Sequence, residues 1–180
     1  AQALKYNLPA IRQQAQFLFI KDNSFDAVIF AYGTHHIPKK DRLLACQEAF
    51  RVLKPGGNIV IHDFEENSPI AQWFNEVVDK YSITGHKCCH FTSTDFRSYL
   101  QRSGFKNIRI FSMYDPFITK GSSKKMAFKK LMDYIFNMYG LEKLQLNSGD
   151  KDVSQKVYRL VEKYIHYELN NTKEVRPYWK

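Results

Sequence analysis

The fold expected for this chain is decided by Arg51-Val52-Leu53-Lys54-Pro55-Gly56-Gly57-Asn58-Ile59-Val60-Ile61-His62-Asp63. Residues Ala45 to Leu53 place apolar side chains at helical spacing, which predicts the end of a helix. Pro55 cannot continue that helix, because it lacks an N–H and clashes with the preceding turn. Gly56-Gly57 can take the positive φ that reverses the chain. Ile59-Val60-Ile61 is a short β-branched run, typical of a strand covered on both faces.

A second strand and its loop lie upstream of this stretch. Phe25 to Ala31 holds an apolar run and predicts a strand, and Tyr32-Gly33-Thr34-His35-His36 is the loop after it. Asp41 to Leu53 is predicted to be the helix that crosses to the next strand, and Lys39-Lys40-Asp41-Arg42 its solvated first turn. Because ligands of parallel sheets bind at the carboxyl ends of the strands, this loop and His62-Asp63 are the candidate site.

The flanking segments predict further elements from their apolar spacing and capping residues. Before the central stretch, the sequence predicts a short strand at Ile11–Ala15. After it, the sequence predicts a helix that begins at Ser68-Pro69, a helix Thr94–Ser103 capped by Thr92 or Ser93, and a strand Asn107–Phe111. Beyond Tyr114 they are a helix from Ser122 or Ser123 to Tyr139 and a helix Asp152–Leu169.

Several of these blocks together resemble class I S-adenosylmethionine-dependent methyltransferases. The blocks that match in order and spacing are Lys21-Asp22-Asn23-Ser24-Phe25-Asp26-Ala27-Val28-Ile29, Tyr32-Gly33-Thr34-His35-His36-Ile37-Pro38, the helix–Pro55-Gly56-Gly57–strand passage and the Gly104-Phe105 turn. The resemblance covers about Ala15 to Ser112. It implies an α/β fold with a partial Rossmann-like methyltransferase sheet and additional C-terminal helices. It also implies an enzyme that transfers a methyl group from S-adenosylmethionine to a small organic acceptor at O, N or C.

The resemblance assigns cofactor contacts to two segments. Gln14 stands where the family has an acidic residue that binds the adenine amino group, and its amide oxygen can still accept a hydrogen bond. Ala15 and Gln16 are expected near the adenine with it. Tyr32-Gly33-Thr34 is expected to approach the methionine end of the cofactor.

The acceptor side is expected to use the histidines and aromatic residues downstream. His35 and His36 are candidate bases, because an acceptor such as a phenol or a carbon acid needs a base with a pKa near neutrality. In the alternative interpretation, one histidine caps the loop or the next helix and the other faces solvent. The candidate substrate residues are His62, Asp63, Trp73, Tyr81 and His86. An alternative interpretation stays open for each group. His62 and Asp63 could be a structural pair that satisfies backbone groups of the loop, and the aromatic residues could lie in the core.

Two cofactor-binding elements of the family are absent from this sequence. They are the glycine-rich turn after the first strand and the acid that holds the ribose hydroxyls, and both lie upstream of the matched region in the family. The chain therefore resembles the C-terminal portion of a methyltransferase, either truncated, proteolysed or a natural half-domain. Residues 1–115 are expected to form this part of the α/β domain. Residues 116–180 are expected to be a helical extension that packs on it as a lid or a homodimer interface.

Composition limits which other classes of protein this chain could belong to. The net charge of +9 is spread over helix faces, which favours a small-molecule acceptor over nucleic acid as partner. No apolar run reaches the ~18 residues of a membrane span. The three cysteines, an odd number, indicate a reducing cytoplasm, and the His and Cys residues show no metal-ligand spacing. Two alternatives to the enzyme for small acceptors stay open: a non-catalytic methyltransferase-like partner protein, and an RNA or tRNA methyltransferase.

Overall fold

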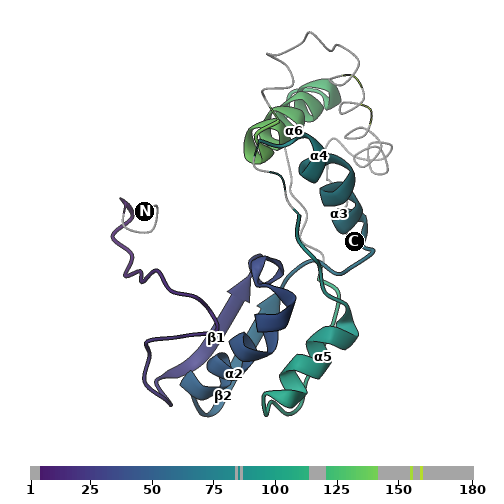
Figure 1. Ribbon diagram of the computed structural model, residues 1–180. Coiled ribbons are helices and arrows are strands. Elements are labelled where there is room, and N and C mark those ends of the chain that lie inside the picture. Colours follow the sequence, from purple (N-terminus) through teal and green to yellow (C-terminus); the bar gives the residue numbers. More distant parts are fainter. Residues whose placement is uncertain are drawn as a thin grey trace. The chain divides into compact units, whose positions relative to one another are not determined.

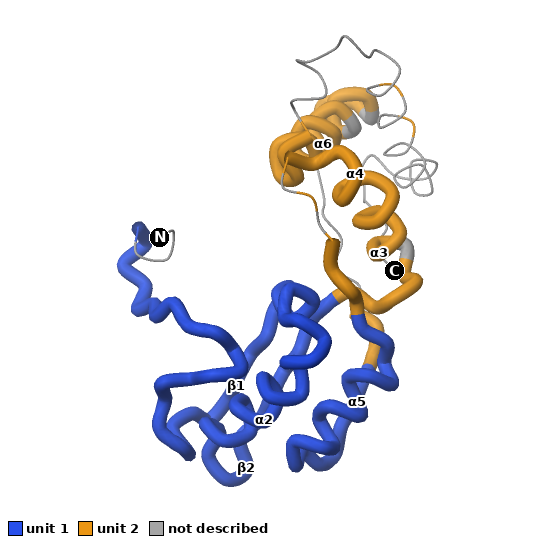
Figure 2. Tube along the Cα trace, in the orientation of Figure 1, with its two compact units in different colours: residues 1–63, 91–110 blue, residues 64–90, 111–180 orange. Residues whose placement is uncertain are grey.

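The structure is a computed structural model, and it describes residues 5–83, 85, 87–113, 121–141, 155 and 159. The chain divides into two compact units (Figure 2). The first comprises Ala1–Asp63 and Phe91–Ile110, and the second Phe64–His90 and Phe111–Lys180. The domain boundary at residue 115 stays a prediction. Of the helices in the described part of the chain, none combines the length and apolar character of a bilayer-spanning segment.

The first unit is built on two parallel strands and the helix between them (Figure 1). Strand β1 is Phe25–Ala31, helix α2 is Arg42–Val52 and strand β2 is Leu53–His62. The strands pair in parallel, with Val28 opposite Ile59 and Ala31 opposite His62. Two 3-10 turns, η1 (Thr34–His36) and η2 (Lys39–Asp41), join β1 to α2, and helix α5 (Ser93–Arg102) follows later in the chain. This arrangement confirms the α/β fold class and the predicted strand–helix–strand order.

The two faces of this sheet differ. Helix α2 buries Ala45, Ala49 and Val52, the residues that the helical spacing predicted to face inward. Ile29 and Val60 are opposite each other in the register and remain 68% and 53% exposed. Because a parallel sheet is ordinarily covered on both faces, this apolar face is unusual for the fold.

The Pro-Gly-Gly segment forms an irregular entry to β2. Phe25 pairs with Leu53 but Ala27 pairs with Asn58, so the extra residues of β2 are taken up at this point. Gly56 has φ +82°, as predicted, and Gly57 does not have a positive φ. A Cβ atom on Gly57 would lie 3.0 Å from the carbonyl oxygen of Lys54 and 3.1 Å from that of Asp26. The prediction of a reversed φ was therefore wrong for Gly57. A glycine is needed at this position because a side chain would collide with the neighbouring backbone carbonyls.

Gly57→Val is expected to destabilise the protein by about 2–3 kcal/mol, because the branched side chain must displace two backbone carbonyls. Gly56→Ala is the matched control, since nothing lies within 4 Å of its Cβ position and the expected cost is only the left-handed conformation, about 1 kcal/mol. Urea unfolding of both variants measures the difference. Equal losses in the two variants would contradict the steric role of Gly57.

The second unit is helical. It contains α3 (Pro69–Trp73), a π-helix η3 (Phe74–Val78), α4 (Asp79–Tyr81) and α6 (Lys124–Tyr139). Ser68 accepts a hydrogen bond from the Ala71 N–H, and Ser123 caps α6 through the Met126 N–H. These caps confirm the helix starts predicted at Ser68-Pro69 and at Ser122 or Ser123. Trp73, Val77, Leu131 and Leu141 are almost fully buried in the shared core.

Two predicted strands were wrong. Residues 11–15 form no strand, because Phe17 donates its N–H to the Gln14 carbonyl and the Gln13 side chain accepts from the Phe19 N–H. Residues 107–111 alternate in polarity but form no strand, and Asn107 has φ +55°. The helix predicted at 152–169 lies outside the described residues, except that 155 and 159 are helical.

Candidate functional site

The loops after β1 and β2 begin next to each other in the first unit. Ala31 and His62 are opposite in the register, and the Tyr32 N–H donates to the His62 carbonyl at 2.8 Å. The chain therefore brings residues 32–36 and 62–63 together at the carboxyl edge of the strands, as the sequence predicted. This edge is where open α/β sheets bind ligands.

Tyr32 adopts an unusual backbone conformation at this edge. Its φ is +51°, a region that bulky residues rarely enter. Its ring centroid lies 4.4 Å from that of His62, and the residue is 42% exposed. Conformations of this kind cost roughly 1–3 kcal/mol and concentrate at ligand-binding sites, so Tyr32 is a candidate binding residue on structural grounds too.

Asp63 connects the two loops. Its side chain is fully buried and accepts hydrogen bonds from the Thr34 hydroxyl, from the His35 backbone N–H at 2.9 Å and from His35 Nδ1 at 2.5 Å. Three donors to one carboxylate favour its ionised form. Asp63 thus holds the turn η1 against the end of β2, the structural interpretation that the sequence left open for this residue.

Arg42 supports the same turn from α2. It is 3% exposed, donates from Nε to the Ile37 carbonyl at 3.0 Å and from Nη2 to the His35 carbonyl at 3.4 Å. Its guanidinium lies 3.9 Å from the centroid of the Phe91 ring. The prediction of a solvated Arg42 was wrong. Its spacing of three and seven residues from Ala45 and Ala49 places it on the buried face of α2, and that signal could have identified it.

His36 is the exposed histidine of the turn. Its N–H donates to the Gly33 carbonyl at 3.2 Å, and its ring centroid lies 4.2 Å from that of His35. Partial burial lowers the pKa of His36, a positive charge on His35 lowers it further, and Asp63 opposes the shift. The lowered pKa favours the neutral form of His36, which can accept a proton.

A family profile described as "Methyltransferase domain" matches residues 5–110, which is more than half of the chain and contains all of this edge. The chain belongs to this methyltransferase-domain family. This membership and the parallel sheet confirm the family and fold class that the sequence predicted.

Curated relatives are similar over part of the methyltransferase domain. A protein of Idiomarina loihiensis named ubiquinone/menaquinone biosynthesis C-methyltransferase UbiE is 36% identical over 77 residues, which are 43% of this chain and 29% of the relative. A protein of Brucella canis with the same name is 30% identical over 120 residues, 57% of this chain and 44% of the relative. The chain thus spans less than half the length of these relatives.

A crystal structure from Thermotoga maritima shares the fold. It is described as a SAM-dependent methyltransferase, possible histamine N-methyltransferase, and aligns with a TM-score of 0.51 at 19% identity. The match covers 66% of this chain and 52% of that one. At this identity the likeness shows the fold alone.

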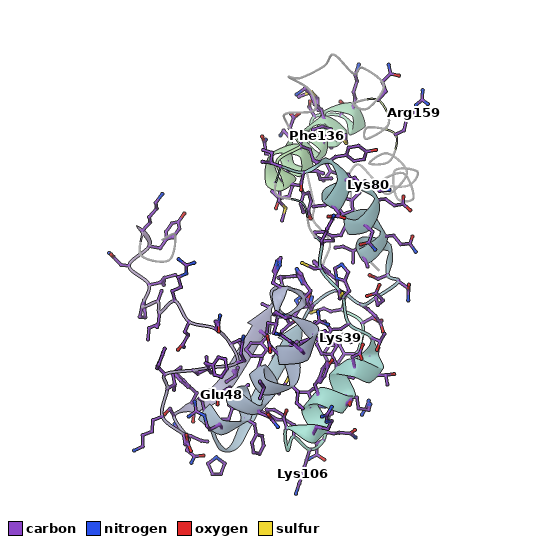
Figure 3. The ribbon with its side chains drawn as sticks, viewed as in Figure 1. Lys39, Glu48, Lys80, Lys106, Phe136 and Arg159 are labelled. Carbon is purple, nitrogen blue, oxygen red and sulfur yellow. The ribbon has the colours of Figure 1, made fainter. Side chains whose placement is uncertain are left out.

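The other predicted site residues of the methyltransferase domain lie elsewhere. Gln14 is exposed, and Gln16 lines an open cavity of ≈ 350 Å³ together with side chains of α2 that include Glu48. Figure 3 labels Glu48 among the side chains of this helix. Glu48 accepts the Leu18 N–H at 2.8 Å and pairs with Arg51, which fixes this loop to α2.

In the second unit, Trp73 is 1% exposed and packs within the hydrophobic core. Tyr81 is half-buried and packs against that core. His86 lies outside the described residues.

Proposed function

We propose that this protein is an S-adenosylmethionine-dependent methyltransferase whose small organic acceptor loses a proton as it is methylated, at a phenolic oxygen or a ring carbon. The observation that carries the proposal is the turn Thr34–His36, which Asp63 holds at the carboxyl edge with His36 exposed and its pKa lowered by partial burial. The names of the curated relatives, which are C-methyltransferases, support a carbon acceptor.

The described residues fit the two ends of the cofactor. S-adenosylmethionine supplies an electrophilic methyl group on a sulfonium cation. The face of an aromatic ring attracts cations, and the ring of Tyr32 is partly exposed at the strand ends, so Tyr32 and the neighbouring Gly33 would hold the methionine end. The exposed amide of Gln14, with Ala15 and Gln16 beside it, would meet the adenine end.

The residues of the turn then divide into two roles. Thr34 and His35 are buried and bonded to Asp63, so in this proposal they position the turn. His36 is exposed, and it accepts the proton that the acceptor hydroxyl or carbon acid releases. His62 lies beside Tyr32 and would line the acceptor side.

The proposal is tested first by binding. S-adenosylmethionine is added at millimolar concentration to protein with labelled histidine and tyrosine side chains, and their NMR shifts are followed, so that weak binding is still detected. Shifts confined to Tyr32, His36 and His62 support the site. Unchanged resonances at these residues overturn it.

Transfer is tested next. Labelled methyl transfer to a hydroquinone, a phenol and a primary amine is compared by mass spectrometry of the products. Methylation of the hydroquinone or phenol supports the proposed acceptor class, and methylation of the amine alone overturns it.

A further inference from the structure

The open cavity of ≈ 350 Å³ in the first unit is lined by residues 16–19 and by side chains of α2. Three of its apolar side chains are exposed: Phe17 by 62%, Phe19 by 93% and Leu44 by 43%. Apolar surface left in water is unfavourable, and exposed apolar side chains gathered at a concave site mark an interaction surface.

The backbone of the loop that carries the two phenylalanines is fixed. The N–H groups of Phe17, Leu18 and Phe19 each donate to a protein acceptor, at 3.1, 2.8 and 2.9 Å. Leu18 is bonded to α2 in both directions, since its N–H donates to Glu48 and its carbonyl accepts from Arg51 Nη2 at 3.0 Å. A surface that is already ordered loses little conformational entropy when a partner binds to it.

Two acids of these segments are already neutralised. Glu48 and Asp22 both pair with Arg51, at 2.7 and 2.6 Å. The hydrogen bond from Arg51 lowers the pKa of Glu48, so the carboxylate that lines the cavity is ionised at neutral pH and has its countercharge beside it.

The charges that remain in these segments are mostly positive. Arg12, Lys21 and Lys40 are exposed and take part in no ion pair within the described part of the chain. Lys21 follows Phe19 by two residues, and Lys40 precedes Leu44 by four. Asp41 is the acid that offsets one of these charges. The balance is positive and attracts an acidic partner.

We propose that this cavity is the docking site for an acidic segment of another protein, which inserts apolar side chains between the two phenylalanines and Leu44. The amides of Gln16 and Gln47 also line the cavity and form no hydrogen bond inside the described structure, so they can bond the backbone of the partner. The inference does not rest on the proposed methyl transfer.

Three other occupants fit the cavity less well. A small molecule is largely enclosed in its site, whereas Phe19 is almost wholly exposed. A second copy of the chain, with its net charge of +9, would bring the same positive residues to the interface. An RNA base would stack on a phenylalanine ring, but the aliphatic Leu44 offers it no aromatic face.

The proposal is tested first with a displayed library of random peptides, selected on the full chain. Counter-selection against a Phe17→Ser, Phe19→Ser double variant removes the peptides that bind elsewhere. The expected peptides combine aliphatic or aromatic residues with aspartate or glutamate. Enrichment of basic or wholly polar peptides, or no enrichment after counter-selection, overturns the proposal.

The affinity of one enriched peptide is then measured by fluorescence anisotropy. Phe19→Ser and Leu44→Gln, which lie on the two opposite walls, are each expected to weaken binding by about tenfold or more. Ile11→Ser is the matched control, because Ile11 is 75% exposed and does not line the cavity. Affinity that is retained in both cavity variants, or lost equally in Ile11→Ser, overturns the proposal. Urea unfolding of each variant shows whether it is folded.

The charge of the partner is tested with Lys21→Glu. This variant is expected to weaken peptide binding by about three- to tenfold at low ionic strength, and less at high ionic strength, where salt screens the attraction. Lys106→Glu, an exposed change beyond the end of α5, is the control and should bind the peptide as the wild type does. An unchanged affinity in Lys21→Glu overturns the acidic partner.

Two further measurements distinguish the other macromolecular occupants. Labelled poly(U) RNA that binds the wild type but not Phe19→Ser overturns the proposal in favour of RNA. A dimer in sedimentation velocity that Phe19→Ser dissociates overturns it in favour of a second copy. A monomer whose RNA binding does not depend on Phe19 supports the protein partner.

Discussion

Asp63→Ala is expected to destabilise the first unit by about 3–5 kcal/mol, since each buried donor left without an acceptor costs about 1–3 kcal/mol. The substitution removes the acceptor of the Thr34 hydroxyl, the His35 N–H and His35 Nδ1 at once. A hydroxyl can rotate to another acceptor, but the backbone N–H is fixed and the buried imidazole has no access to water. The unfolding free energy from urea denaturation, with the fluorescence of the aromatic residues as signal, measures this cost.

Asp26→Ala is the matched control. Asp26 also pairs with a cation, Lys54 at 2.8 Å, but its side chain is 85% exposed. An exposed pair of this kind adds little to stability, so the midpoint should remain close to that of the wild type. If the two variants lose the same stability, the buried contacts of Asp63 do not hold the turn.

Local patterns predicted most of the first unit. Strand β1, helix α2 and strand β2 were expected from apolar spacing and from Pro55-Gly56-Gly57, because these signals act within a few residues of chain. The caps at Ser68 and Ser123 were also readable, since a hydroxyl before an amphipathic run bonds the first turn of its own helix.

The contacts inside the candidate site could not be predicted in the same way. Asp63 and His35 are 28 residues apart, and they meet only because β1 and β2 pair in one particular register. The sequence placed both residues at the same edge, but it gave no reason for Asp63 to bond His35 rather than His36. The positive φ of Tyr32 is likewise imposed by the surrounding contacts, since a tyrosine has no preference for it.

The wrong prediction of a strand at residues 107–111 shows that a local pattern alone does not decide whether a strand forms. Alternating polarity makes a strand possible, but a strand forms only where a neighbour offers its backbone. In the described structure the Ile108 carbonyl accepts from Arg97 Nη1 at 3.4 Å, so a side chain takes up a group that a sheet would use. The prediction of a solvated Arg42 was wrong for a different reason. It gave more weight to the charge of the side chain than to its position on the buried face of α2.

His36→Asn is expected to lower methyl-transfer turnover by ~10²–10⁴, the usual contribution of a general base. Asparagine keeps the polarity and approximate size of the side chain but cannot accept a proton near neutral pH. Affinity for S-adenosylmethionine should stay within a few-fold, because His36 is assigned to the acceptor and Tyr32 to the cofactor. Turnover at saturating cofactor and acceptor, together with a cofactor titration, measures both quantities. Lys40→Gln, an exposed change in η2, serves as the control with unaltered turnover.

The pH dependence of turnover should also differ between the wild type and His36→Asn. Burial, and after it the charge of His35, lower the pKa of His36, so the wild-type rate should rise with pH through a pKa below the usual histidine value and then level off. The variant should lack this rise and should regain activity at high pH, where the acceptor ionises without help. A His36→Asn variant with wild-type turnover and the same pH profile would exclude His36 as the base. Catalysis at this edge would then rest on the positioning of acceptor and cofactor alone.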